Sequence, residues 1–209
     1  MTDLVVTKVR DRSSNLSNDN SSNSNTNELP YSTLEEFLKH IERRAFHMAR
    51  LSTRHLDDAH DIVQESMYKL IEKYAQKQPK DWRPLFFTIL NSKITDYYRR
   101  NLIRDKIFLK IKPAIQDFDD YANWENDTAK APSDYEPNSR LSRQQNINKL
   151  SFYIKQLPNR QKQAFMLRCW EGYSTQETAS IMACSQGSVK THYSRAIKKL
   201  RTLLEAQHD

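Results

Sequence analysis

Residues 174–200 read STQETASIMACSQGSVKTHYSRAIKKL, and this stretch decides the fold. It opens with a capping box, in which the Ser174 hydroxyl accepts a bond from a free helix N–H and Glu177 reaches back to the cap. The three residues from Ala183 to Ser185 separate a short helix from a longer basic helix, which Ser185 caps. A short helix, a three-residue turn and a longer basic helix make the helix-turn-helix plan, whose second helix enters the major groove of DNA.

The second helix of this plan is predicted to have an apolar face and a basic face. Val189, Tyr193, Ala196 and Leu200 recur at helical spacing and are predicted to face the core. The predicted DNA-facing side chains are Gln186, Ser188, Lys190, Thr191, Ser194, Arg195 and Lys198. Among these, the side chains suited to base edges are Thr191, Ser194 and Arg195, whereas those suited to phosphates are Lys190 and Lys198, together with Lys199 and Arg201. The alternative is a small bundle with a solvated basic helix, but the capping box, turn spacing and basic face coincide here.

Ala183 stands at a turn position where glycine is common. A left-handed backbone at a residue with a side chain costs about 1 kcal/mol. Packing around Cys184 and Ile181 is expected to tolerate this cost.

Composition points to an all-α chain. Only 2 of 209 residues are glycine, whereas nucleotide-binding loops, nucleophile elbows and tight hairpins need glycine for positive φ or close backbone approach. No apolar run reaches the roughly 20 residues that cross a bilayer, and the N-terminus has no signal-peptide core, so we expect a cytoplasmic protein without membrane insertion. Cys169 and Cys184 lie 15 positions apart, which supports neither a disulfide framework nor a zinc site, and both are predicted to be buried.

Charge divides the chain into four parts. The net charge of +7 is the sum of −1 over residues 1–30, +5 over 31–110, −4 over 111–140 and +7 over 141–209. The Ser/Asn-rich first part is predicted to be a disordered tail, and the acidic third part, which holds three prolines, an irregular linker. Two basic domains on an acidic tether indicate contact with a polyanion at two places. An ordinary charge spread on a soluble protein remains the alternative.

The segment LDDAHDIVQES, residues 56–66, opens a helix with two distinct faces. Its predicted core face comprises Ile62, Val63, Met67, Leu70, Ile71 and Tyr74. On the other side Asp57, Asp61 and Glu65 form an acidic stripe, which is not expected to face DNA. A solvated face balanced by Lys69 and Lys73 is the alternative.

The segment LFFTILNSKITDYYRR, residues 85–100, combines packing residues with an aromatic and basic end. The predicted packing residues are Phe86, Phe87, Ile89, Leu90 and Ile94. The end holds Tyr97, Tyr98, Arg99 and Arg100, and such a mixture suits unpaired DNA, because each base stacks on a ring for about 1–3 kcal/mol while cations hold the backbone. Core packing is the alternative for the tyrosines, of which at least one is predicted to be structural.

These segments together resemble a known family. Residues 157–161 (LPNRQ), 171–179 (EGYSTQETA) and 187–192 (GSVKTH), with Arg195-Ala196, look like domain 4 of bacterial RNA polymerase sigma factors. Residues 56–66 resemble the D-A-x-D-[LIV]-V-Q-E-[ST] segment of sigma domain 2, and residues 85–100 resemble its promoter-opening helix. This order, with only a linker between, is similar to the extracytoplasmic-function (ECF) group. The resemblance implies sigma domain 2 over 31–110, sigma domain 4 over 141–209, and RNA polymerase core and promoter DNA as partners.

The resemblance also implies residue roles. Asp61, Gln64 and Glu65 would dock on the β′ clamp helices of the polymerase, and domain 4 would meet the β flap and read the −35 duplex. A loop at about residues 76–83 would receive a base flipped from the −10 strand. The residues assigned to the −10 element are Lys80, Trp82, Arg83, Asn91, Lys93, Tyr97, Arg99 and Arg100. The family further implies an anti-sigma factor and a linker that threads near the polymerase cleft.

Two other functions are weighed against this one. A stand-alone helix-turn-helix transcription regulator would need a sensing or dimerising N-terminal domain, which the acidic stripe and the aromatic-basic helix argue against. A DNA-acting enzyme such as a serine recombinase would need an α/β catalytic core, which the glycine count makes improbable. His40, His47, His55 and His60 are scattered without a ligand set, so no metal, cofactor or catalytic residue is predicted.

Overall fold

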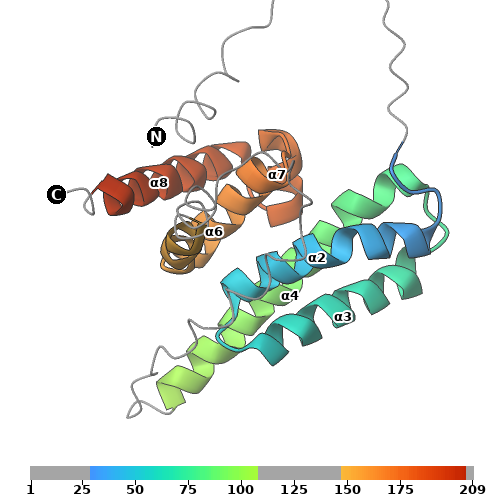
Figure 1. Cartoon of the computed structure of the whole chain (residues 1–209), viewed down its shortest axis with the longest axis horizontal. Coiled ribbons are helices and arrows are strands. Elements are labelled where there is room, and N and C mark those ends of the chain that lie inside the picture. Colours follow the sequence, from blue (N-terminus) through green and yellow to red (C-terminus); the bar gives the residue numbers. More distant parts are fainter. Residues whose placement is uncertain (1–28, 108–146, 206–209) are drawn as a thin grey trace, which may run out of the picture.

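The computed structural model describes residues 29–107 and 147–205, and these ranges are helical with no strand in either. The first range forms an N-terminal bundle of α2 (Leu34–Ser52), α3 (Leu56–Tyr74) and α4 (Pro79–Ile107). The second range forms a C-terminal bundle of a helix over 147–155, α6 (Asn159–Phe165), the π-helical turn η3 (Met166–Trp170), α7 (Thr175–Met182) and α8 (Gln186–Glu205). The bundles lie side by side, with α4 in contact with α6 and α7 (Figure 1). The predicted all-α fold with two helical domains is confirmed.

The described residues include only part of the predicted domains. Nearly all of the predicted tail, residues 1–28, lies outside the described residues, and so does the whole predicted linker over 111–140. Their predicted irregularity therefore stays a prediction. Within the described ranges, no helix is long and apolar enough to span a membrane.

A capping box begins α2, and an aromatic cluster then packs this helix against the start of α4. In the capping box, the Glu36 N–H donates to Thr33 Oγ1 at 3.2 Å and the Glu36 carboxylate accepts from the Thr33 N–H at 3.2 Å. The Phe37 ring then lies 6.0 Å from Trp82 and 6.1 Å from Phe86, centroid to centroid. Phe37 and Phe86 are fully buried, and burying one such ring contributes about 1.5–3 kcal/mol.

Helix α4 begins earlier than the sequence analysis predicted. The predicted loop at residues 76–83 is shorter, because Pro79 starts α4 and Lys80, Trp82 and Arg83 are already helical. Proline suits the first position of a helix, where its missing N–H has no partner to lose, and Asp81 favours the positive end of the helix dipole. The packing residues predicted for this helix, from Phe86 to Ile94, are all buried, which confirms that face.

The predicted core face of α3 is right except at one position. Ile62, Val63 and Leu70 are buried, whereas Ile71 is 46% exposed. Ile71 is rotated by about 100° from Leu70 around the helix, which turns it away from the side that packs on α2 and α4. With Tyr68, which is 69% exposed and three residues earlier, Ile71 forms an apolar strip on the outer surface.

Local signals set the ends of the C-terminal helices as predicted. The Glu177 N–H donates to Ser174 Oγ at 3.2 Å and the Ser174 N–H donates to the Glu177 carboxylate at 2.7 Å, so the capping box is present. Ala183 has φ 49° and ψ 54°, the left-handed conformation expected there. The Ser188 N–H donates to Ser185 Oγ at 3.1 Å and caps α8. Gly172, with φ 73°, takes the other left-handed position, after η3.

The two cysteines differ from the prediction of burial. Cys184 is partly buried, but Cys169 is exposed, so the prediction is wrong for Cys169. Cys169 lies in the π-helical turn η3, and its predicted burial rested on the usual hydrophobic behaviour of a free cysteine rather than on its place in a helix. Its sulfur lies 3.1 Å from the Tyr193 hydroxyl oxygen, and both cysteines are free thiols.

Candidate nucleic-acid interface

The first candidate surface is the outer face of α8. Val189, Ala196 and Leu200 are buried and anchor the helix, while Tyr193 packs against the core at its edge. This anchoring turns the opposite face to solvent, and the exposed side chains there are Gln186, Lys190, Thr191, Ser194, Arg195 and Lys198. The predicted division of α8 into an inner and an outer face is therefore confirmed.

Three side chains of α8 already take part in hydrogen bonds within the protein. Ser188 is partly buried and its hydroxyl lies 2.9 Å from that of Ser185, so it belongs to the helix cap. The Thr191 hydroxyl donates to the Gly187 carbonyl at 3.0 Å. The Lys199 ammonium donates to the Gln156 carbonyl at 3.1 Å, which directs it toward the first helix of the bundle.

The field around α8 is positive. His192 lies between the DNA-facing positions, and its pKa is lowered first by burial and then by the positive charges of Arg160 and Arg195. Burial disfavours the charged imidazole by itself, and the two arginines add to this effect, which places positive charge around this part of α8. This positive charge attracts phosphate groups.

The second candidate surface runs along α4, and the structure divides its predicted residues into groups. Lys80, Arg99 and Arg100 are exposed, and Arg99 lies 3.8 Å from Asp96 on the same helix. Lys93 is partly buried and pairs with the Glu65 carboxylate of α3. Lys80 lies in the first turn of α4, and Arg99 and Arg100 lie in its last third, where exposed cations suit contact with a polyanion.

Trp82 and Tyr97 are structural rather than available to DNA. Trp82 is 4% exposed and packs in the aromatic cluster with Phe37, so the expectation that it lines a base pocket is wrong in this structure. Tyr97 is 8% exposed, and its hydroxyl accepts from the Arg54 N–H at 3.0 Å and donates to Asp58 at 2.9 Å. Burial, the largest cause, raises the pKa of Tyr97. The prediction that at least one of the two tyrosines is structural is confirmed.

The C-terminal bundle covers Asn91 and pairs with Arg83, whose side chain stays 31% exposed. Arg83 Nη2 donates to the Glu171 carbonyl at 2.8 Å and lies 3.0 Å from the Glu171 carboxylate. Asn91 is buried, and its amide donates to the Ile181 carbonyl at 3.4 Å. No local pattern signals these partners, because Glu171 lies 88 positions beyond Arg83 and Ile181 lies 90 positions beyond Asn91.

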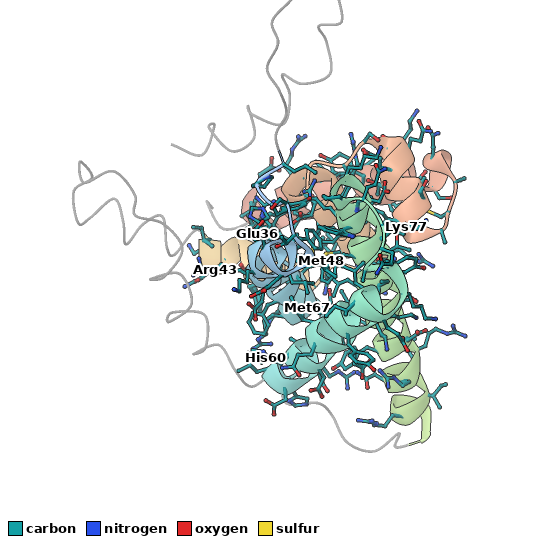
Figure 2. The ribbon with its side chains drawn as sticks, turned by 90° about the vertical axis from the view of Figure 1, so that its right-hand side faces the viewer. Glu36, Arg43, Met48, His60, Met67 and Lys77 are labelled. Atoms are coloured by element: carbon teal, nitrogen blue, oxygen red, sulfur yellow. The ribbon has the colours of Figure 1, made fainter. Side chains whose placement is uncertain are left out.

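The third candidate surface is the outer face of α3. Asp57, Asp61, Gln64 and Glu65 are all exposed, so the acidic stripe exists. The apolar strip of Tyr68 and Ile71 follows it on the same helix, and sequence reasoning missed this strip because Ile71 was assigned to the core. Figure 2 shows His60 on α3, on the side of the N-terminal bundle away from the orange C-terminal helices. A charged stripe beside an exposed apolar strip is typical of a protein-binding surface.

Within residues 29–107 and 147–205, no group of three or more His, Cys, Asp or Glu side chains is placed to hold a metal ion. The candidate surfaces on the described residues are the basic face of α8, the exposed cations of α4 and the acidic face of α3.

Comparisons with known proteins point to one family. The model "Sigma-70, region 4" matches residues 147–200. Two curated relatives, the RNA polymerase sigma-E factors of Streptomyces avermitilis and Streptomyces antibioticus, are each 41% identical over 54 residues, which is 26% of this chain and 30% of the length of each relative. The ECF RNA polymerase sigma factor EcfG of Rhodopseudomonas palustris is 29% identical over 150 residues, which is 71% of this chain and 72% of that protein.

Solved structures share the fold. The sigma factor RpoE of Bartonella quintana, in complex with the anti-sigma factor NepR, is 20% identical with a TM-score of 0.59, over 82% of this chain and 98% of that one. CnrH, in complex with the cytosolic domain of CnrY, is 18% identical with a TM-score of 0.52, over 83% of this chain and 88% of that one. Both likenesses extend across the two helical bundles.

Proposed function

We propose that this chain is an RNA polymerase sigma factor of the ECF group, which binds core RNA polymerase and directs it to promoters by reading two DNA elements. The observation that carries the proposal is the exposed basic face of α8, anchored by buried Val189, Ala196 and Leu200 behind a left-handed turn. Every chemical step would belong to the polymerase, and this chain would act by binding in the cytoplasm.

The C-terminal bundle would read the −35 duplex through α8. Ser194 and Arg195 are exposed in the helix and carry donors for base edges, and the planar fork of Arg195 suits guanine. Gln186, Lys190 and Lys198 are exposed around them and would position the helix on the phosphates. The Ser188 hydroxyl serves the helix cap, so we assign it a supporting role.

The N-terminal bundle would hold the melted −10 strand along α4. Lys80, Arg99 and Arg100 are exposed and would contact the phosphate backbone of the strand. Lys93 would join them after its ion pair with Glu65 breaks. Strand opening needs no nucleotide hydrolysis, because contacts that exist only with separated strands shift the DNA toward the open form. Trp82 and Tyr97 support the fold of this surface from inside.

The outer face of α3 would dock on the polymerase. Asp61, Gln64 and Glu65 are exposed and would meet the β′ clamp helices, and we add Tyr68 and Ile71 as the apolar part of the contact. Aromatic side chains are enriched at the centres of protein interfaces, with charged groups at the rim. The C-terminal bundle would contact the β flap.

We further propose that an anti-sigma factor binds this chain. The supporting observation is that the RpoE structure of Bartonella quintana contains the anti-sigma factor NepR and that the CnrH structure contains the cytosolic domain of CnrY. The surfaces that such a partner would mask are those assigned above to polymerase and DNA.

Reconstitution with polymerase tests the proposal. The full chain is mixed with sigma-free core polymerase, complex formation is followed by gel filtration, and transcription is measured from a promoter library. We expect a complex and selective start sites. A chain that fails to bind core polymerase contradicts the proposal, and a dimer that binds duplex DNA without polymerase would instead indicate a stand-alone helix-turn-helix regulator.

A further inference from the structure

We infer that a pocket beside the end of α2 binds the phosphate group of a small molecule. The pocket has a volume of about 230 Å³, and its lining includes three cationic side chains, Arg54, Lys155 and Lys162. We call it the three-cation pocket. The inference goes beyond the proposed function, which assigns no role to any of these three side chains.

Four separate stretches of the chain build the three-cation pocket. The end of α2 at Ser52 and the two residues that follow it supply one part of the lining. The last third of α4 supplies another part. Lys155, at the end of the helix over 147–155, and Lys162 of α6 complete it. Polar groups from four stretches therefore converge on one cavity, as they do in sites for small molecules.

Lys162 is the buried cation of the pocket. It is 2% exposed, and its ammonium group donates to the Leu51 carbonyl at 2.8 Å, the Tyr98 hydroxyl at 3.1 Å and the Lys155 carbonyl at 3.0 Å. These acceptors are all neutral, and no carboxylate among the described residues forms an ion pair with Lys162. Burying an ammonium group without an opposite charge costs free energy, and an anion in the pocket would supply that charge.

The other two cations lie close enough to act on the same buried groups. Burial, and after it the positive charge of Lys155, lowers the pKa of Lys162 to about 7 and that of His47 to about 4. Burial is also the main cause that raises the pKa of Tyr98 to about 12, and the positive charge of Arg54 opposes this rise. Positive charges that lie close together repel one another, whereas an anion placed among them is attracted by each.

The rest of the lining favours an anion over a cation. Within the part of the chain that the structure describes, no Asp or Glu side chain lines the pocket. Asp58 accepts from the Tyr97 hydroxyl at 2.9 Å but does not belong to the lining. The Tyr98 hydroxyl accepts from Lys162, and no described residue accepts its own hydrogen, so it can donate to an oxyanion.

A purely structural role explains Lys162 but not the pocket as a whole. The Leu51 and Lys155 carbonyls lie at the ends of two helices, where carbonyl groups carry partial negative charge and favour a nearby cation. One ammonium group is sufficient for that role. It leaves unexplained why Lys155 and Arg54 line the same cavity together with a hydroxyl donor.

The charge and the size of the pocket favour a phosphate group on a small molecule. A phosphate group carries up to two negative charges and several acceptor oxygens, which match three cations and a hydroxyl better than a carboxylate does. Sites for drug-sized ligands measure about 300–1,000 Å³, so a pocket of about 230 Å³ accommodates a phosphate group with few further atoms. A nucleic-acid strand offers the same group, but a continuous strand needs an open channel, whereas Lys162 is buried.

Isothermal titration calorimetry of the full chain with inorganic phosphate tests the inference, at a fixed ionic strength set with chloride. Lys162→Met removes the buried charge and keeps a side chain of similar length. The matched control Lys149→Met removes one charge at an exposed position of the helix over 147–155. A second variant, Tyr98→Phe, removes only the hydroxyl donor.

We expect wild type and Lys149→Met to bind phosphate equally, and Lys162→Met to bind it about tenfold or more weakly, because a hydrogen bond to a charged group contributes that much. Tyr98→Phe is expected to weaken binding several-fold. Equal binding by Lys162→Met and Lys149→Met overturns the inference, and so does a wild type that binds no phosphate. Should circular dichroism show that Lys162→Met is unfolded, Tyr98→Phe decides, and unchanged binding by that variant overturns the inference.

A labelled single-stranded oligonucleotide distinguishes the two sources of the phosphate group. Its binding to wild type, Lys149→Met and Lys162→Met is measured by fluorescence anisotropy. We expect Lys162→Met to bind the oligonucleotide as the control does. A loss of oligonucleotide binding as large as the loss of phosphate binding would assign the pocket to nucleic acid and overturn the small-molecule source. None of these measurements uses polymerase, so a failure of the proposed function leaves their outcome unchanged.

Discussion

Replacing Ala183 by glycine is expected to stabilise the protein, whereas glycine in the interior of a helix destabilises it. Ala183 has φ 49° and ψ 54°, where a Cβ atom costs about 1–2 kcal/mol, and glycine removes that cost. Glycine also gives the unfolded chain more freedom, which offsets about 0.4–1 kcal/mol. Ala183 is exposed, so losing its methyl group forfeits little burial. The net gain is about 0.5–1 kcal/mol, or about 1–4 °C in Tm for a chain of this size.

The assay is urea unfolding of the full chain, followed by far-ultraviolet circular dichroism. The matched control is Ala179→Gly, four residues earlier and buried inside α7, which is expected to destabilise by about 1–2 kcal/mol through helix propensity and a lost methyl contact. The same chemical change thus has opposite signs at the two positions. Destabilisation by Ala183→Gly would refute the reasoning, because it would mean that the turn is not left-handed at this residue.

Two substitutions and one change of pH give three further predictions. Arg195→Ala is expected to cost about 1–3 kcal/mol in −35 binding and to relax one base position in a selection from random duplexes, whereas Arg201→Ala should weaken all sequences alike; a uniform loss for Arg195→Ala would mark it as a phosphate contact. Asp61→Ala is expected to weaken binding to core polymerase in a pull-down and to leave DNA binding unchanged. The control Glu72→Ala, also at an exposed position on α3, is expected to leave both kinds of binding unchanged. Burial and then Lys155 lower the pKa of Lys162 to about 7, from an ordinary value of 10.5, so the folded protein should gain stability as pH rises from about 7 toward 10 and lose it as pH falls back. Urea unfolding at pH 7 and pH 9.5 measures this, and a stability that falls with rising pH would contradict it. The charged or titratable groups that line the pocket beside Lys162 are Arg54, Tyr97, Tyr98 and Lys155, and burial raises the pKa of Tyr98 to about 12, so that it stays protonated over this range.

Local signals made the helix-turn-helix predictable from sequence. The capping box at Ser174 and Glu177, the cap at Ser185 and the left-handed residue Ala183 are set by side chains within a few positions of one another. Helical periodicity then divides α8 into its two faces, because every third or fourth residue shares a side. All of this is contained in one short window of the chain.

The candidate site on α4 was less predictable, because its residues depend on distant partners. Trp82 has an aromatic ring with one polar N–H and lies near cations in the sequence, a pattern that fits a base pocket as well as a protein core. Only its contacts with the Phe37 and Tyr31 rings show that it belongs to the core. Arg83 meets Glu171 across 88 positions, and no pattern along the sequence announces such a pair. Arg100 is exposed on α4 as predicted, because its exposure follows from the helix itself and depends on no distant partner.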